Sequence, residues 1–320
     1  MMYRSTELAI LVPTKDRPGK LRNLLDSLAG QTQSAGRILI VDGGASVRDV
    51  VMAYADRLPV EHHLCRPPGQ IRQRNMGIAL IDDRTPLVAS LDDDIVFEPD
   101  AIEQMIAFWN LVEAETAAVA FNQINTPREP DTWLRRLFLL SGPQPGRVLR
   151  SGFTTSNNPA AANHRTDWVS GGAAVWRRDI LRQHPHRELP SRWAIGEDVI
   201  FSYRISRRHP MYVCAASRVR HEHVFDYGVA RRERFHGRTQ TLWLFHFVES
   251  TPDLSVPAFL WAVAGSALGR GLAAAARADR RHLEFAIGQM EALASLAAGR
   301  LRGKDSAAVI ERDARSAGGG

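Results

Sequence analysis

The chain has 320 residues, of which 44% are hydrophobic and 24% are charged, proportions typical of a soluble globular protein with one large domain and an accessory piece. Its net charge of +6 rests almost wholly on arginine, and no basic block with interleaved aromatic residues predicts nucleic-acid binding. The isolated cysteines Cys65 and Cys214 exclude a disulfide framework and a zinc pattern, and they favour a reducing, cytoplasmic location.

Strand-like and helix-like segments alternate along the first part of the chain. Short apolar runs predict strands at residues 8–12, 37–41, 60–64, 87–91 and 117–121. Apolar residues at helical spacing predict helices at residues 19–29, 47–58, 70–81 and 100–113. Because strands that alternate with helices form parallel βαβ units, we expect an α/β fold with a doubly wound, mainly parallel sheet of the Rossmann type.

Three consecutive aspartates, Asp92, Asp93 and Asp94, follow the predicted strand that ends at residue 91. Alternate side chains of an extended chain share a face, so Asp92 and Asp94 can converge while Asp93 points away. Two carboxylates held close repel each other, and a divalent cation relieves the repulsion. The same three aspartates are also compatible with a solvated acidic turn that precedes a helix. Asp42 also ends a predicted strand, and because ligands bind outside the carboxyl ends of such strands, we expect these aspartates to share one crevice.

Several short motifs follow one another along the chain. They are Val-Pro-Thr-Lys-Asp-Arg-Pro at 12–18, Ile-Val-Asp-Gly-Gly at 40–44, Gly-Gln-Ile-Arg-Gln-Arg-Asn-Met-Gly at 69–77, and the three aspartates. In this order they resemble the family-two glycosyltransferases of the GT-A fold, and the resemblance covers roughly residues 8–223. The resemblance implies an Asp-x-Asp site in which Asp92 and Asp94 hold Mn²⁺ or Mg²⁺. It places Asp42 against the nucleotide base. Its full set of implied nucleotide-binding residues is Pro13, Thr14, Arg17, Asp42, Arg74, Asp92 and Asp93.

The middle of the chain carries two further motifs of that family. Gly171 and Gly172 resemble its Gly-Gly turn and would let the backbone approach the donor sugar, although an ordinary strand bend fits equally well. Trp193 can form an apolar wall for a sugar or belong to the core. Glu197 and Asp198 open a helix predicted to reach about residue 208, where acidic residues also stabilise the helix dipole. The resemblance makes Asp198 the general base on the acceptor hydroxyl and Glu197 an orienting group.

His221 and His223 follow a predicted strand at 211–215. On an extended segment both imidazoles can lie on one face, and neutral imidazole is a good metal ligand. The resemblance implies that one histidine in this region completes the metal site, with His221 ahead of His223. Placement on the surface or in the core stays an open alternative for both residues.

In the remainder of the chain the sequence predicts helices, and no catalytic or binding residue is assigned there. Helices are predicted at residues 227–248, 256–268 and 280–301. Residues 122–165 predict a long irregular connection, which by resemblance would lie near the acceptor. No stretch reaches the roughly 18 to 20 apolar residues of a spanning helix. The apolar segment 256–268 either packs on protein, against the catalytic domain or in a homodimer, or makes peripheral contact with the inner face of a membrane that carries a lipid-linked acceptor.

The sequence therefore predicts a GT-A catalytic domain at 1–226, a helical region at 227–301 and a disordered tail at 302–320. The predicted function is inverting transfer of a sugar from a UDP-, dTDP- or GDP-linked donor to an acceptor hydroxyl. Asp92-x-Asp94-x-Val96 also mimics the nucleophile motif of haloacid-dehalogenase phosphatases and phosphotransferases, but that family carries the motif on its first strand. A carbohydrate-binding scaffold without activity is the remaining alternative.

Overall fold

The chain forms two compact units. The computed structural model describes residues 2–187, 196–222, 230–300 and 305–317. The sheet unit comprises Met1–Arg128, Ser156–Glu188 and Phe201–His223, and the helical unit comprises Glu129–Thr155, Leu189–Ile200 and Val224–Gly320. This division differs from the expected boundary at residue 226, because two segments inside the expected catalytic domain, 129–155 and 189–200, belong to the helical unit.

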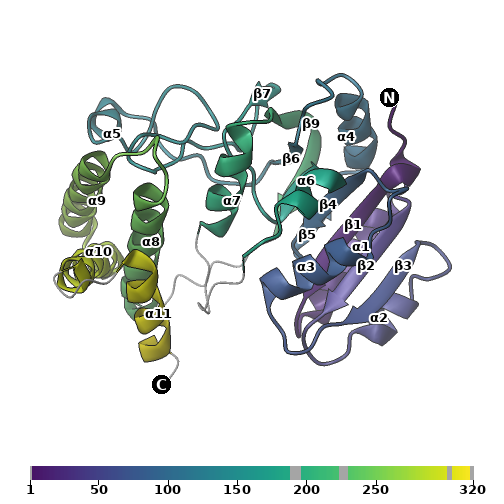
Figure 1. The fold of residues 1–320 in the computed structure, drawn as a ribbon, viewed down its shortest axis with the longest axis horizontal. Helices are drawn as coiled ribbons and strands as arrows, with labels where there is room; N and C mark the ends of the chain where they lie inside the picture. The colour runs from purple at the N-terminus through teal and green to yellow at the C-terminus, as the bar shows by residue number, and fades with distance from the viewer. Residues whose placement is uncertain (1, 188–195, 223–229, 301–304, 318–320) are drawn as a thin grey trace. The chain divides into compact units, whose positions relative to one another are not determined.

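The described strands of the sheet unit form one sheet in the order β3-β2-β1-β4-β8-β6-β9-β5, with β7 paired to β9. They are β1 (Leu8–Thr14), β2 (Arg37–Asp42), β3 (Val60–Leu64), β4 (Leu87–Leu91), β5 (Ile95–Phe97), β6 (Ala118–Gln123), β7 (His164–Arg165), β8 (Ala173–Arg177) and β9 (Met211–His221). The first four strands pair in parallel, whereas β8 runs antiparallel to both β4 and β6. The expected doubly wound, mainly parallel α/β sheet is confirmed (Figure 1).

Helices cover both faces of this sheet because its strands are apolar on both sides. The helices are α1 (Pro18–Ala29), α2 (Arg48–Met52), α3 (Gln70–Leu80), α4 (Ala101–Trp109), α6 (Arg178–Gln183) and α7 (Glu197–Ser206), after a 3-10 turn at Ser5–Glu7. In β1, Leu8, Ile10 and Val12 join a core with leucines of α1. The alternate residues Ala9 and Leu11 join a second core with Ile78 of α3. The buried strands therefore hold their carboxyl ends rigidly at one edge.

Most predicted elements are present, and the differences lie at their ends. The helix expected over 47–58 is only α2, and the strand expected at 211–215 extends to His221 as β9. Strand β5 is absent from the sequence prediction. It forms because Ile95–Phe97 pairs antiparallel with the end of β9, Ile95 opposite His221.

The helical unit contains α5 (Trp133–Leu137), α8 (Ala230–Glu249), α9 (Val256–Arg277), α10 (Arg280–Arg300) and α11 (Ser306–Ala317) (Figure 1). Its core includes Leu242 and Trp243 of α8 and Phe259 of α9. The tail expected to be disordered contains the helix α11, so that prediction is wrong for this segment. The helix is ordered because Val309 and Ile310 are buried in the same core. α9 continues beyond residue 268 to Arg277, so it is long and apolar enough to cross a membrane, contrary to the sequence prediction.

Candidate active site

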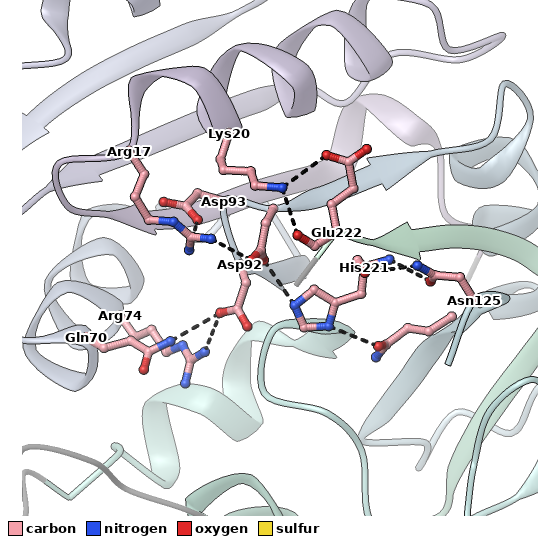
Figure 2. A network of polar contacts seen from close by, with 11 residues as sticks. Arg17, Lys20, Gln70, Arg74, Asp92, Asp93, Asn125, His221 and Glu222 are labelled. Atoms are coloured by element: carbon pink, nitrogen blue, oxygen red, sulfur yellow. Dashed lines mark hydrogen bonds and ion pairs between the residues drawn. The ribbon is translucent and has the colours of Figure 1, made fainter. Parts of the chain in front are cut away.

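Three aspartates at the end of β4 form the centre of a polar network in the sheet unit (Figure 2). Asp93 and Asp94 are buried, whereas Asp92 is partly exposed. The backbone N–H of Asp92 donates to the carbonyl of Gly172 at 2.9 Å, which fixes the turn against β8. Asp92 pairs with Arg74, whereas Asp93 and Asp94 share Arg17, so basic side chains on both sides balance the negative charge.

Arg17, the residue before α1, bridges Asp93 and Asp94. Its guanidinium donates to Asp93 Oδ1 at 2.6 Å and to Asp94 Oδ2 at 2.7 Å. The hydroxyl of Thr14 donates to Asp93 Oδ2 at 2.7 Å. Burial raises the pKa of Asp93 to about 6, although Thr14 and Arg17 act in the opposite direction. The buried carboxylates are therefore tolerated because every one of them has a close hydrogen-bond donor.

His221 reaches the aspartates from the last position of β9. Its Nε2 lies 3.0 Å from Asp94 Oδ1, while its Nδ1 lies 3.3 Å from Oε1 of Gln123. Burial lowers the pKa of His221, but the hydrogen bond and charge of Asp94 outweigh it and raise the pKa overall. Burial likewise raises the pKa of Asp94, but His221 and Arg17 hold it well below its ordinary value. The imidazole and the carboxylate thus form a strong pair.

Asp92, Asp94 and His221 have the geometry of a metal site. One ligand atom from each lies within 4.8 Å of the others, in the part of the chain that the structure describes. Ligand atoms lie roughly 2 Å from Mg²⁺ or Mn²⁺, so two ligands of one ion are at most roughly 4 Å apart, and a small contraction of the group accommodates an ion. Two carboxylates and one imidazole suit such a cation. The convergence of Asp92 and Asp94 agrees with the sequence prediction, whereas His223 lies outside the described residues.

Two residues that the sequence analysis did not identify hold His221 in place. Gln123, at the end of β6, accepts from Nδ1 when that nitrogen carries the proton, which leaves Nε2 facing Asp94. Asn125 exchanges two hydrogen bonds with the backbone of His221, at 2.9 and 3.0 Å (Figure 2). Such outer partners set the tautomer and orientation of a metal-binding histidine. No local motif marks either residue, because their role depends on the pairing of β6 with β9.

The Gly-Gly turn lies against Asp92. A Cβ added at Gly172 would be 2.1 Å from Asp92 Oδ2, a distance that no side chain permits. The hydroxyl of Ser90 donates to the carbonyl of Gly171 at 2.9 Å and fixes the same turn. In the structure Gly172 lies against the carboxylate of Asp92, and the approach of Gly171 and Gly172 to the donor sugar stays a prediction. Trp193, the other residue expected near the sugar, lies outside the described residues.

α3 supplies the basic partners of Asp92. Arg74, which is buried, donates to Asp92 Oδ1 at 3.1 Å, and the amide of Gln70 donates to the same oxygen at 3.2 Å (Figure 2). Gln73 donates to the carbonyls of Thr14 at 2.9 Å and Val41 at 2.7 Å. The Gln73 side chain therefore links the carboxyl ends of β1 and β2 by hydrogen bonds.

The structure shows the protein partners of Asp42, whose contact to the nucleotide base stays a prediction. Its carboxylate is fully buried and accepts from the backbone N–H groups of Gly44 at 2.9 Å and Val47 at 3.0 Å. His62 Nε2 lies 3.2 Å from the same carboxylate. We conclude that Asp42 shapes the loop after β2, since no carboxylate oxygen reaches the surface. Pro13 is also buried, in register with Val41, and so it too faces away from solvent.

Glu197 and Asp198 occupy the first turn of α7, as predicted, and belong to the helical unit. Gly196 before them has φ +86°, a left-handed conformation that glycine adopts without strain. A cavity of about 110 Å³ opens beside this turn and is lined mainly by apolar residues, among them Phe153, Val199 and Trp243. The cavity therefore lies at the same end of α7 as the acidic turn, but Glu197 and Asp198 are not among the residues that line it.

Comparison with known proteins gives consistent results. The model of "Glycosyl transferase family 2" matches residues 9–184. A curated relative, the uncharacterized glycosyltransferase YwdF of Bacillus subtilis (strain 168), is 30% identical over 136 residues, which cover 41% of this chain and 49% of that protein. The match thus spans about half the length of that relative.

Two solved structures show the same fold. The mannosyltransferase PcManGT from Pyrobaculum calidifontis, solved with GDP-Man and Mn²⁺, has a TM-score of 0.54 at 16% identity and covers 98% of this chain and 80% of its own. GalNAc-T7, solved with UDP, GalNAc and Mn²⁺, has a TM-score of 0.53 at 12% identity and covers 81% and 54%. The fold is that of the GT-A glycosyltransferases. With its family match, sheet topology and strand-end aspartates, the chain belongs to glycosyl transferase family 2.

Proposed function

We propose that this protein transfers a sugar from a nucleoside-diphosphate donor to an acceptor hydroxyl, with inversion at the anomeric carbon. The observation that carries the proposal is the convergence of Asp92, Asp94 and His221 at the carboxyl end of β4. Such strand ends are where ligands bind in doubly wound sheets. Two GT-A structures of similar fold hold a nucleotide or nucleotide sugar together with Mn²⁺, which supports the same class of donor here.

The donor side of the reaction belongs to the sheet unit. Asp92, Asp94 and His221 would hold Mg²⁺ or Mn²⁺, and that ion would stabilise the negative charge that develops on the diphosphate leaving group. Arg17 is partly exposed and already lies against Asp93 and Asp94, so it can also meet a phosphate oxygen. Arg74 and Gln70 fix Asp92 from the other side and keep its carboxylate in the group.

The acceptor side is assigned to the start of α7. In the proposed step the acceptor oxygen attacks the anomeric carbon, its proton passes to the carboxylate of Asp198, and the bond from that carbon to the diphosphate breaks. Glu197 would orient the acceptor or Asp198. What supports this assignment is the resemblance of Glu197 and Asp198 to the Glu-Asp segment of glycosyl transferase family 2. The cavity at Gly196 and Val199 lies at the same end of α7, but neither carboxylate lines it.

The donor assignment is tested by calorimetric titration of UDP, GDP, dTDP and CDP, each with and without Mn²⁺. We expect one diphosphate to bind tightly only with Mn²⁺, and the matching monophosphate to bind weakly because it lacks the oxygens that bridge to the ion. Its sugar conjugates are then screened for transfer. Absence of Mn²⁺-dependent binding for all four nucleotides would contradict the proposal.

The phosphatase alternative predicts different chemistry at the same residue. A haloacid-dehalogenase phosphatase would form a phosphoryl or fluoroberyllate adduct on Asp92. Here the aspartates end the fourth strand along the chain, and Asp92 is held by Arg74 and Gln70. Mass spectrometry after treatment with beryllium fluoride should show an unmodified Asp92, and an adduct there would replace the transferase proposal.

A further inference from the structure

The outward face of α9 is apolar along its whole length. Leu260, Trp261, Leu268 and Leu272 are between 46% and 60% exposed. At 3.6 residues per turn these four positions lie within about one third of the helix circumference, so they share one face. The other exposed positions of this helix before Arg277 are proline, alanine and glycine. A surface helix of a soluble protein normally turns charged residues to water. An exposed apolar face of this kind is typical of a surface that contacts another protein or a membrane.

The opposite face of α9 fixes the orientation of the helix. Phe259, Ala262 and Val263 are fully buried. The guanidinium of Arg270 lies 3.5 Å from the centre of the Phe285 ring of α10, so the charge in the middle of the helix is turned inward. The apolar face is therefore held outward by packing within the helical unit.

α5 extends the same surface. Trp133 is 76% exposed, and Leu134 and Leu137 beside it are also exposed. The indole N–H of Trp261 donates to the carbonyl of Leu137 at 2.9 Å, and the Trp261 ring stacks on Phe138 with 4.8 Å between ring centres. These contacts place α5 beside α9 in the helical unit. We define the apolar surface as Trp133, Leu134, Leu137, Leu260, Trp261, Leu268 and Leu272.

We propose that this apolar surface docks on a bilayer that contains anionic lipid, with α9 lying in the interfacial region. Tryptophan and leucine are the side chains that partition into that region. Arg277 at the end of α9 and Arg280 at the start of α10 are exposed next to the apolar face, where they can meet anionic headgroups. The core helix of a soluble protein can be equally long and apolar, but such a helix is mostly buried. In α9 only 22% of the apolar 18-residue stretch is buried.

The packing of α9 favours a helix that lies on the membrane over one that crosses it. α8 and α10 contact α9, and Arg234 of α8 forms an ion pair with Glu291 of α10. A crossing helix would carry these charges into hydrocarbon at a cost of several kcal/mol. An interfacial helix leaves them in water. This inference does not depend on the proposed transfer reaction.

The experiment is sedimentation of the full chain with two kinds of vesicle, phosphatidylcholine alone and an equal mixture with phosphatidylglycerol. We expect stronger binding to the mixed vesicles. Leu268→Asp with Leu272→Asp should weaken binding at least about tenfold, because both side chains leave the bilayer. Arg277→Gln and Arg280→Gln should each weaken binding to the mixed vesicles roughly fivefold. Leu111→Asp is the matched control, since Leu111 is 82% exposed on the sheet unit, and it should bind as wild type does.

A second measurement uses the protein without charge changes. Lipids brominated at the upper acyl carbons should quench tryptophan fluorescence in the wild type and quench it less in Trp133→Phe. Light scattering and thermal melts of each variant report assembly and folding. Failure of the wild type to bind either vesicle would overturn the proposal. So would a homodimer that Leu268→Asp dissociates without any vesicle binding, because a second copy would then cover the surface.

Discussion

The two units of this protein gather different kinds of unfavourably placed residues into clusters. The sheet unit buries charge, since Asp93 and Asp94 after β4 and Arg74 on α3 are all buried. The helical unit exposes apolar side chains, among them Trp133 and Leu272. Each arrangement is unfavourable in an isolated soluble domain, because a buried charge loses hydration and an exposed apolar face keeps its contact with water.

This difference agrees with the proposal that the two units meet different partners. Buried carboxylates paired with Arg17 and His221 can exchange those partners for a cation without a large change in structure. An exposed apolar face can only lose water, which requires a surface that excludes it. The sheet unit is thus suited to a small, charged donor, and the helical unit to an extended, apolar environment.

The largest effect should come from removing a charge in the sheet unit. Asp94→Asn keeps the size of the side chain but removes the negative charge that faces both Arg17 and His221. Loss of the ion and its several kcal/mol of charge stabilisation should lower kcat/KM on the order of 10³- to 10⁴-fold. Calorimetry should also show that Mn²⁺-dependent nucleotide binding is lost.

Asp49→Asn is the matched control for this variant, because Asp49 is exposed on α2 in the same unit. It should leave both binding and rate unchanged. If Asp94→Asn melts as the wild type does and still binds nucleotide with the same Mn²⁺ dependence, the metal assignment is wrong.

The next largest effect should come from the proposed base, Asp198, which lies in the helical unit. It should distinguish the role of this unit from that of the sheet unit. Asp198→Asn keeps hydrogen-bonding reach but removes the proton acceptor, so kcat should fall about 10²- to 10⁴-fold. Donor affinity should stay at the wild-type value, since the residues proposed to hold the donor are in the sheet unit. The measurements are initial transfer rates and calorimetric donor affinity.

Glu197→Gln serves as the comparison for Asp198→Asn. It should lower kcat less if Glu197 only orients a neighbour. An equal loss in the two variants would exchange their roles, and a fall in donor affinity equal to the fall in rate would place Asp198 in the donor site instead.

The sequence predicted the parts of this molecule that depend on neighbours along the chain. The aspartates, the Gly-Gly turn and the acidic start of α7 each form a short motif, and strands such as β3 and β4 have the predicted bounds. β5 was missed because three residues are too few to show a period. Its pairing with β9 brings His221 to Asp94, so the third ligand was expected only by resemblance.

Residues whose role depends on distant partners could not be predicted. The buried turn that satisfies Asp42 and the amide of Gln123 beside His221 both require the folded sheet. The same holds for the apolar surface, because the sequence shows an apolar segment in α9 but not which face Phe259 buries. The sequence analysis also ended this helix too early, at residue 268 instead of Arg277. The alanines near Arg277 favour a helix but add no large apolar side chains to the pattern.

A smaller effect is expected when the metal site is altered without any change of charge. Gly172→Ala adds a Cβ that would lie 2.1 Å from Asp92 Oδ2, so the carboxylate must move. Mn²⁺ affinity should fall roughly 10- to 100-fold, while the melt changes little. Gly19→Ala in α1 is the matched control, because its added Cβ meets nothing within 4 Å. Equal Mn²⁺ affinity in Gly172→Ala and wild type would show that Asp92 is no ligand.

The smallest effect should come from Gln123, which touches the histidine and none of the other proposed ligands. With Nδ1–H donated to Gln123 Oε1, the Nε2 of His221 is directed toward Asp94 and is free to bind an ion once it is deprotonated. Gln123→Ala removes that acceptor, so Mn²⁺ affinity should fall roughly tenfold while nucleotide affinity in the absence of metal stays unchanged. Gln123→Glu keeps an acceptor at the same place and should restore most of the affinity. Nitrogen-15 NMR of the imidazole should show the Nδ1-protonated tautomer in the Mg²⁺-bound wild type and a mixture in Gln123→Ala. A loss that Gln123→Glu does not restore, with the tautomer unchanged, would mean that Gln123 supports the fold of β6 and does not orient His221.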